Sequence, residues 1–175
     1  MTGPVVVRPV GPGDGGTSAL AEVLVDCVEG GASVGFLLPL EYERAVAFWV
    51  DALERAGRGE RIVLVAQEDG TGAIVGTVQV LLDTPENQPH RGDISKMLVH
   101  RRARRRGIGE ALMRAAEAAA SEAGKRLMVL DTASGEAERL YVRLGWQRVG
   151  AIPGYGLTPG GALEGTTVFY KDLTR

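Results

Sequence analysis

The stretch DISKMLVHRRARRRGIGEALM, residues 93–113, decides the fold. It starts with a short apolar run at residues 94–99, which is typical of a buried strand. A cluster of arginine and glycine follows, and the chain continues directly into an alanine-rich segment with helical periodicity. The turn between them predicts a phosphate-binding site, because a helix N-terminus exposes unpaired N–H groups and the positive end of the helix dipole. Gly107 and Gly109 lack the Cβ that would keep an anion away from this backbone.

The composition of the chain is that of an ordinary globular protein. Its 175 residues are 45% hydrophobic, with a mean hydropathy of +0.01, which fits a single domain spanning residues 1–175. No apolar run approaches the ~18 to 20 residues of a membrane span, and the N-terminus lacks a signal-peptide pattern. We therefore expect a cytoplasmic protein that makes no membrane contact. One cysteine and two histidines without ligand spacing predict neither an internal disulfide nor a metal site.

Charge is distributed unevenly along the sequence. The formal net charge of -2 gives no general attraction to nucleic acid, yet five arginines fall between positions 101 and 106. In isolation such a cluster suggests a nucleic-acid patch or a nuclear signal. The acidic remainder and the Gly-x-Gly helix start immediately after the cluster favour a phosphate loop, so we expect no nucleic-acid partner. Arg101 and Arg102 are expected to be solvated.

The first half of the chain predicts a strand, two helices and a hairpin. Residues 5–10 are a β-branched run, and from Ser18 one helical face carries Leu20, Val23, Leu24, Cys27 and Val28. A second helix at about residues 40–56 has a face of Val46, Trp49, Val50 and Leu53. Residues 62–67 and 73–82 form a hairpin around a glycine-containing turn. Cys27 is expected to be a small core residue, because nothing basic is placed to lower its pKa.

The second half alternates strands and helices. The helix after Gly107 has an apolar stripe of Ile108, Leu112, Ala115 and Ala119 and ends at Gly124. A strand at 127–130 ends at Asp131, and a helix follows at about 134–144 with Ala137, Leu140, Tyr141 and Leu144 on one face. Two last strands, 146–151 and 166–171, flank a loop rich in Pro and Gly. The order βααβββαβαββ predicts an α/β fold on a mixed sheet.

Two motifs in this order resemble those of the GNAT superfamily of N-acetyltransferases. Residues 104–109, RRRGIG, resemble its acyl-CoA-binding motif, R/Q-x-x-G-x-G/A, at a strand-to-helix turn. Residues 137–146, AERLYVRLGW, resemble its second signature, Leu-Tyr-x-x-Leu-Gly-aromatic. The likeness covers essentially the whole chain. It implies a mostly antiparallel mixed sheet with a splayed parallel strand pair, flanked by helices, and acetyl-CoA as cosubstrate.

Within the superfamily, the sequence is similar to the tabtoxin-resistance acetyltransferases. The similar segments are GGASVGF at 30–36, KMLV at 96–99, VLDT at 129–132 and the C-terminal stretch from Arg148. Those enzymes acetylate an amino group of a β-lactam-bearing amino-acid toxin. The resemblance therefore implies transfer of an acetyl group to a primary amine of a small molecule, with a role in resistance or detoxification.

The resemblance also implies which residues hold the cofactor. Backbone N–H groups from Arg104 to Gly109, including those of Arg105, Arg106, Gly107 and Ile108, would surround the pyrophosphate, while arginine side chains screen the remaining charge. The pantetheine arm would pair with the strand edge at Met97, Leu98 and Val99, whose N–H groups would also hold the developing oxyanion. Ser134 stands where many members have Asn, and it is assigned to the cofactor site.

Acyl transfer to an amine needs an acid and a base. Tyr141 occupies the family's position for the acid, although a core aromatic with a hydrogen-bonded hydroxyl would explain the same pattern. Asp93 and Asp131 are the candidate bases, but an Asp that closes a strand often caps a turn or helix. Phe36 and Tyr155, from two glycine-rich loops, are predicted to line the substrate pocket.

Three functions remain open at this level. The first is a small-molecule N-acetyltransferase. The second is the same chemistry on a protein N-terminus or lysine, and the third is a non-catalytic acyl-CoA-binding sensor. The sequence leaves open whether the chain forms a homodimer.

Overall fold

The computed structural model describes residues 4–174, and the strands and helices within that range follow the predicted order. The strands are β1 (Val5–Val10), β2 (Arg61–Glu68), β3 (Ile74–Leu81), β4 (Arg91–Val99), β5 (Leu127–Thr132), β6 (Gln147–Leu157) and β7 (Leu163–Asp172). The helices are α1 (Thr17–Glu29), α2 (Tyr42–Gly57), α3 (Ile108–Glu122) and α4 (Gly135–Arg143), with a short 3-10 helix, η1 (Arg101–Ala103). The predicted fold class is thereby confirmed.

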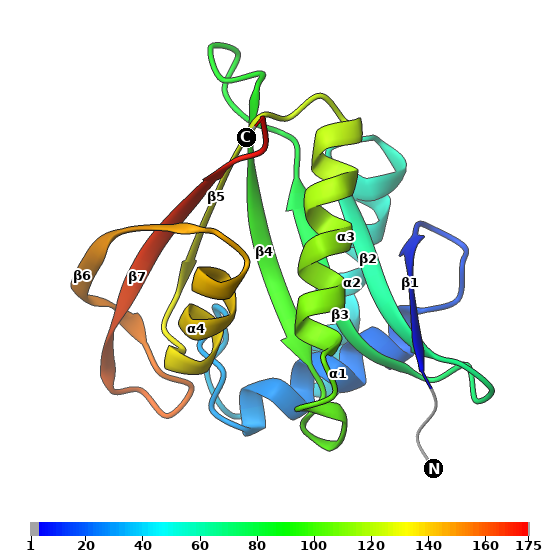
Figure 1. The fold of residues 1–175 in the computed structure, drawn as a ribbon. Helices are drawn as coiled ribbons and strands as arrows, with labels where there is room; N and C mark the ends of the chain where they lie inside the picture. The colour runs from blue at the N-terminus through cyan, green and yellow to red at the C-terminus, as the bar shows by residue number, and fades with distance from the viewer. Residues whose placement is uncertain (1–3, 175) are drawn as a thin grey trace.

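One sheet carries these strands in the order β1-β2-β3-β4-β5-β7-β6. Only β4 and β5 are parallel, and they pair over just three positions, Arg91–Asp93 against Leu127–Val129. Beyond these positions the two strands diverge, as Figure 1 shows, from their contact near the C-terminus toward the ends next to α4 and α1. The predicted splayed pair is present, and the second half of β4 has no neighbour on its β5 side.

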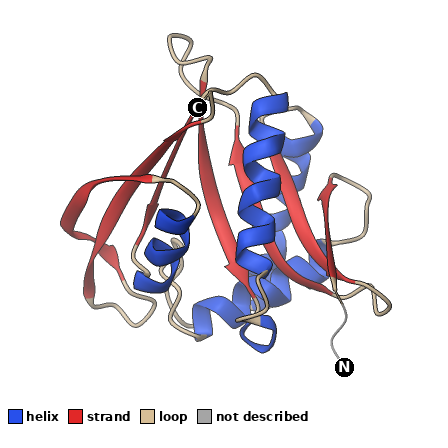
Figure 2. Ribbon diagram, in the orientation of Figure 1, coloured by secondary structure: helices blue, strands red, loops and turns tan. Residues whose placement is uncertain are grey.

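Helices cover both faces of the sheet (Figure 2). The apolar side chains of α3 and α4 pack on one face with Leu64, Ala66 and Val78, and those of α1 and α2 pack on the other with Val63 and Val65. This follows from the pleat, because successive side chains of β2 point to opposite faces. Strand β3 is buried along almost its whole length, as expected for a strand covered on both sides.

The predicted apolar face of α2 is correct at three of its four positions. Trp49 and Leu53 are buried and Val46 packs against the same core, but the side chain of Val50 is 43% exposed. The buried face is completed by Ala45 and Ala52 instead. Val50 follows Trp49 directly, so it is turned by 100° away from the line on which Trp49 packs.

The predicted loop between the last two strands is wrong over most of its length. Strand β6 continues to Leu157 and β7 begins at Leu163, so a short turn at residues 158–162 closes a long hairpin. The hairpin tolerates Pro153 because β6 is an edge strand, where a missing N–H need not break a ladder. The register shifts between Ile152 and Gly156, which accommodates the additional residues as a bulge.

Candidate active site

The glycine turn before α3 has the geometry of an anion site. Gly107 is the N-cap of α3 with φ of 74°, and no side chain caps the helix there. The first-turn amides that follow have no acceptor within the helix. A Cβ added to Gly107 would meet no atom within 4 Å, so the space above the loop is open. Arg105 also has a positive φ, 61°, and such alternating backbone conformations turn successive N–H groups toward a common point.

Gly109 lies at a close contact between α3, α4 and β4. A Cβ at this position would lie 3.2 Å from Cδ2 of Leu140 in α4 and 3.8 Å from Sδ of Met97 in β4. Glycine at this position lets α3, α4 and the edge of β4 approach closely, and a Cβ here would displace the side chain of Leu140 slightly. In the pattern Gly-x-Gly, Gly107 thus borders open space at the helix start and Gly109 lies at a packing contact, and cofactor binding at both residues stays a prediction.

The three arginines of the motif have different surroundings. Nη1 of Arg106 lies 2.7 Å from Oε1 of Glu68 on β2, and this hydrogen bond holds the pKa of Glu68 below its usual value. Nε of Arg104 donates to the carbonyl of Val99 at 3.2 Å. Arg105 is exposed and has no side-chain partner among residues 4–174. Of the three side chains, that of Arg105 is the one most available to a ligand phosphate.

Arg101 and Arg102 both have exposed side chains, as predicted, but Arg101 is also ion-paired. Arg101 forms an ion pair with Asp26 of α1 at 2.9 Å, and its backbone N–H donates to the same carboxylate. This contact joins the start of the phosphate loop to α1. Arg102 is exposed, as predicted.

Cys27 is buried on α1, as predicted, but a basic group does lie beside it. Burial raises the pKa of the Cys27 thiol, while the charge and hydrogen bond of Arg104 act in the opposite direction. Burial has the larger effect, so the thiol remains protonated. Cys27 Sγ is 3.4 Å from the carbonyl oxygen of Val99, which supports a packing role below the end of β4.

Strand β4 contains a bulge at the point where the cofactor arm was predicted to pair. Its register against β3 shifts between Ser95 and Leu98, and Lys96 has a φ of 52°. The bulge turns the backbone of residues 96–97 out of the regular ladder, on the side that β5 leaves unoccupied. The side chain of Leu98 packs in the α1/α2 core, and that of Met97 packs against the α3 side.

Tyr141 lies on α4 in the core on the α3 side of the sheet, where its side chain is 4% exposed. Its ring packs against Phe169 and Trp146 at centroid distances of 5.9 and 6.1 Å. Tyr141 is thus a core aromatic, as the alternative interpretation expected, and no hydrogen bond of its hydroxyl is found within residues 4–174. Burial raises the pKa of Tyr141 well above the usual value, and the charge of Asp131 raises it further. The phenol is therefore a protonated donor near Asp131.

The two candidate carboxylates differ in position. Asp93 lies at the last paired position of β4 and β5, and its Oδ1 is 2.5 Å from Nη1 of Arg91. Asp131 lies two residues beyond the pairing on β5, where the strands have separated, and its Oδ2 accepts a 2.7 Å hydrogen bond from Thr166. The register places both on the α1/α2 face of the sheet. Asp131 and Tyr141 thus lie on opposite faces of the sheet, beside the gap that separates residues 94–99 of β4 from residues 130–132 of β5.

The side chain of Ser134 caps the N-terminus of α4. Its Oγ accepts a hydrogen bond from the backbone N–H of Ala137 at 3.2 Å, which satisfies the first turn of α4. Its backbone N–H donates to Oγ1 of Thr132. A contact of this hydroxyl with a cofactor therefore stays a prediction.

The segment between α1 and α2, residues 30–41, closes one side of the gap. The N–H of Leu38 donates to the carbonyl of Pro159 at 2.9 Å, and the hydroxyl of Ser33 donates to the carbonyl of Leu157 at 3.2 Å. These bonds join the segment to the tip of the β6–β7 hairpin. Residues 30–41 and the hairpin tip thus form a continuous border around the ends of β4 and β5.

The predicted substrate-wall residues are placed differently from each other. Phe36 in this segment is half-buried and contacts Phe48 of α2 edge to face, with ring centroids 5.4 Å apart. Phe48 in turn lies 5.5 Å from Nζ of Lys96. Tyr155 is on β6 rather than in a loop, and its side chain is 60% exposed. Phe36 therefore belongs to an aromatic wall beside β4, while nothing in the structure links Tyr155 to it.

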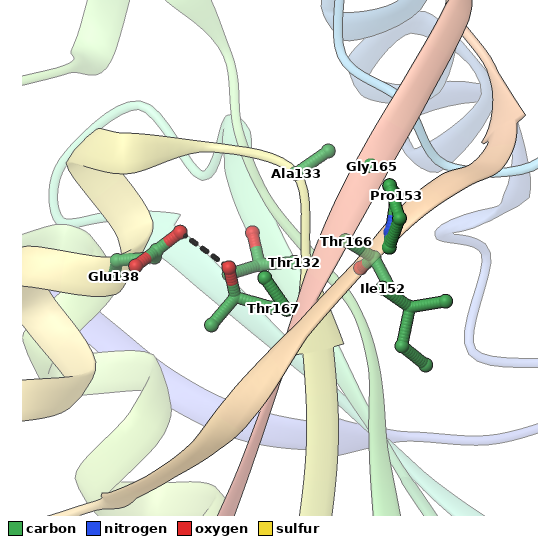
Figure 3. A pocket seen from close by; sticks show the side chains of 9 residues that line it. Thr132, Ala133, Glu138, Ile152, Pro153, Gly165, Thr166 and Thr167 are labelled. Atoms are coloured by element: carbon green, nitrogen blue, oxygen red, sulfur yellow. Dashed lines mark hydrogen bonds between the residues drawn. The ribbon is translucent and has the colours of Figure 1, made fainter.

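A shallow cavity of about 230 Å³ adjoins Asp131. Figure 3 shows Glu138 reaching toward Thr167 from α4, with Ile152 and Pro153 on the opposite side from β6. Thr167 donates to Glu138 at 2.8 Å, and the neighbouring Thr166, which also lines the cavity, donates to Asp131. The cavity thus lies between the end of β5, the start of α4 and the β6–β7 hairpin.

Comparison with known proteins agrees with this geometry. The sequence model of the Acetyltransferase (GNAT) family matches residues 22–146, so the chain belongs to this family. A ribosomal-protein-alanine N-acetyltransferase from Brucella melitensis superposes with a TM-score of 0.79 at 22% identity, over 95% of this chain and 99% of that one. A phosphinothricin acetyltransferase from Sinorhizobium meliloti in complex with acetyl-CoA gives 0.78 at 20% identity, over 98% and 89%. An N-acetyltransferase from Staphylococcus aureus Mu50 gives 0.79 at 19% identity, over 97% and 98%.

The chain is therefore an acyltransferase of the GNAT type, with acetyl-CoA as its cosubstrate. The residues present fit this cosubstrate. The open space above Gly107, the uncapped start of α3 and the exposed Arg105 suit a pyrophosphate, and the unpaired edge of β4 suits a peptide-like arm. No helix among residues 4–174 is long and apolar enough to cross a membrane.

Several residues of the site were not predicted from the sequence. They lie on the face of the sheet that α1 and α2 cover, and they are Phe48, Lys96, Arg61 and Gln79. The helical pattern of α2 emphasised Trp49 and so passed over Phe48. Lys96 stood within the KMLV segment, but a bulge with a positive φ at lysine has no signal in a single sequence.

Proposed function

We propose that this protein transfers the acetyl group of acetyl-CoA to a primary amine of a small molecule, with Asp131 as base and Tyr141 as acid. The observation that carries the choice of a small molecule is the closed border formed by residues 30–41 and the hairpin tip, joined through Leu38 and Pro159. An extended peptide needs an open groove at this point. A small amine needs only the space enclosed by residues 30–41 and the hairpin tip.

The roles of the residues follow from their positions. Bound acetyl-CoA supplies a thioester whose carbonyl carbon the amine attacks. Asp131 receives the proton that the substrate ammonium loses, directly or through a water molecule, while N–H groups near Leu98 stabilise the oxyanion. Tyr141 donates a proton to the sulfur that leaves. Base and acid lie on opposite faces of the sheet, so the attacking nitrogen and the departing sulfur, which are different substituents of the tetrahedral carbon, can each meet a separate group.

Asp93 has a secondary role in this proposal. Its ion pair with Arg91 leaves the carboxylate less free to accept a proton than that of Asp131. We assign it to orienting the water or the ammonium at the closed end of the gap.

The acceptor is an amino-acid-like amine in this proposal, with β-lactam amino-acid toxins as one class to test. The sequence similarity to tabtoxin-resistance acetyltransferases supports this choice, as does the general shape shared with a phosphinothricin acetyltransferase at 20% identity. Resistance or detoxification is then the biological role, and the cytoplasm is where acetyl-CoA would be supplied.

The test is a panel of amines assayed by release of free coenzyme A thiol. The panel contains amino acids, tabtoxinine-like β-lactams, polyamines and peptides with free N-termini or lysines. We expect turnover of small amines and at least tenfold lower kcat/KM for every peptide. Turnover of peptides alone would indicate a protein acetyltransferase, and tight coenzyme A binding without any turnover would indicate a sensor.

A further inference from the structure

The chain has three lysines, and Lys96 differs from the other two. Nζ of Lys125 donates to the carbonyls of Leu82 and Pro89, and Nζ of Lys171 lies 2.6 Å from both Glu117 and the carbonyl of Leu144. Lys96 has no hydrogen bond or ion pair within residues 4–174. It is nevertheless partly buried. A buried ammonium is normally paired, so the missing partner requires an explanation.

The backbone holds Lys96 in this position. The residue sits on the bulge of β4 with a φ of 52°, a conformation that costs a non-glycine residue of the order of 1 kcal/mol. Its ammonium is 5.5 Å from the ring centroid of Phe48, and Phe48 contacts Phe36 from residues 30–41. The lysine is thus presented at the aromatic wall of the acceptor side.

A second cation without a carboxylate partner lies nearby. Arg61 on β2 donates from Nη1 to Oε1 of Gln79 at 2.7 Å, and neither its Nε nor Nε2 of Gln79 has an acceptor. Burial lowers the pKa of Lys96, and the positive charge of Arg61 lowers it further, while only the charge of Asp131 opposes this. Nζ of Lys96, Nε of Arg61 and Nε2 of Gln79 are all donors without an acceptor, and the carboxylate of Asp131 also acts on Lys96 through its charge. Such a site has a positive potential that an anion would neutralise.

We propose that Lys96 is the counter-ion for an anionic group on the acceptor, so that the substrate is a small amine carrying a carboxylate, as an amino acid does. This inference rests on the proposed function. Asp131 receives the ammonium end of such a molecule and Lys96 receives the carboxylate end, with Phe36 and Phe48 packed against the carbon chain. Arg61 acts through its charge, because its Nε is buried. Lys96 determines specificity and takes no part in proton transfer.

The kinetic test compares L-alanine, L-methionine, L-lysine and L-phenylalanine with their carboxamides, which keep the shape and remove the negative charge. For each pair the measured quantity is the ratio of kcat/KM for the acid to kcat/KM for the amide. In Lys96→Met we expect this ratio to fall about 10- to 100-fold, the usual contribution of a hydrogen bond to a charged group. Lys96→Arg keeps the charge and should retain most of the preference. Comparing ratios between enzymes cancels the different amine pKa values within each pair.

Arg126→Met is the matched control, since it removes one exposed cation at the start of β5, at the paired end of the sheet. It should leave the ratio unchanged. A merely structural role for Lys96 on Phe48 would lower thermal stability without changing the ratio. An unchanged ratio in Lys96→Met would therefore overturn the inference, even with full activity on amines.

An independent measurement does not need turnover. With only three lysines, the side-chain carbons can be followed by NMR of lysine labelled with ¹³C at Cε, with Lys96→Arg to assign its signal. Addition of an amino acid should raise the pKa of Lys96, and its carboxamide should not. If no amine of the panel is acetylated but this shift occurs, the proposed function fails for that panel while the anion site stands. No shift with any amino acid contradicts the anion site.

Discussion

At the scale of single residues, the surroundings of Tyr141 keep its phenol protonated, which the proposed acid role requires. Its hydroxyl is unpaired within the described residues, and burial together with Asp131 keeps the phenol protonated. Tyr141→Phe should lower kcat about 100-fold, the lower end of general acid catalysis, because a thiolate needs only modest assistance. Calorimetric binding of acetyl-CoA should be unchanged. Tyr42→Phe, which alters an exposed tyrosine at the start of α2, is the control and should retain full kcat. Equal kcat in Tyr141→Phe and wild type would exclude the acid role.

The same pKa shift predicts the alkaline side of the pH profile. An acid must be protonated to act, and a raised pKa keeps it so at higher pH. We therefore expect kcat to show no decrease from tyrosine ionisation up to about pH 10, the ordinary value for a phenol. A decrease in kcat centred at pH 9 that disappears in Tyr141→Phe would contradict the shift.

The positions of the two carboxylates predict different losses. Asp131→Asn removes the proposed base at the open end of the gap, so kcat/KM should fall by about 100-fold or more near neutral pH. The loss should shrink as pH rises, because the amine then deprotonates in solution.

Asp93→Asn should lower kcat/KM about tenfold or less, since Asp93 is already paired with Arg91. Thr166→Val keeps the carboxylate and removes its hydrogen bond, and is expected to have the smallest effect. A larger loss in Asp93→Asn would exchange the roles of the two aspartates.

At the scale of elements, helix α3 has a left-handed glycine at each end, which allows a matched comparison. Gly107 precedes the helix with φ of 74° and Gly124 follows it with φ of 81°, and both have space for a Cβ. Alanine at either position should lower stability by about 1 kcal/mol because of backbone strain. Only Gly107→Ala should also weaken acetyl-CoA binding, by roughly tenfold, since its Cβ would extend into the anion site. The measurement is the dissociation constant of acetyl-CoA for each variant. Equal constants for the two variants would show that Gly107 is not part of the proposed phosphate site.

At the scale of the whole molecule, Asp26 and Arg101 join α1 to the phosphate loop. Burial alone would raise the pKa of Asp26, but its hydrogen bonds with Arg101 and the nearby charges of His100 and Arg101 bring it below 3.8. A carboxyl with a depressed pKa in the folded protein stabilises the fold above its unfolded pKa. Asp26→Asn should therefore cost about 1 to 2 kcal/mol at neutral pH.

This difference in stability depends on pH in a defined direction. It should stay constant above about pH 5 and decline as pH falls below the ordinary value of 3.8, where the wild-type carboxylate is protonated. Urea unfolding of both proteins at pH 7 and at pH 3 measures it. A stability difference that is larger at pH 3 would rule out the stabilising ion pair. Glu29→Gln, which alters a more exposed neighbour of Arg101, should have little effect at either pH.

The sequence by itself determined the order of elements and the glycine turn that begins α3, where we propose that phosphate binds. Periodicity identified the buried faces of α1 and α4, and Gly107 marked the start of α3, because these signals are local and depend on residues within one or two turns. It could not determine that β6 and β7 extend to Leu157 and from Leu163, since Pro and Gly at an edge strand look like a loop until the pairing partner is known.

Only the tertiary structure decided how the site is assembled. The sequence treated Arg101 and Arg106 as parts of one basic cluster, but their carboxylate partners Asp26 and Glu68 come from α1 and β2, distant in the chain. Asp131 and Tyr141 are ten residues apart in the sequence, and nothing in it indicated that they would lie near each other on opposite faces of the sheet. It gave no sign that Lys96 would lie unpaired beside Phe48, because a bulge and an ion pair are decided by the neighbours that folding brings together.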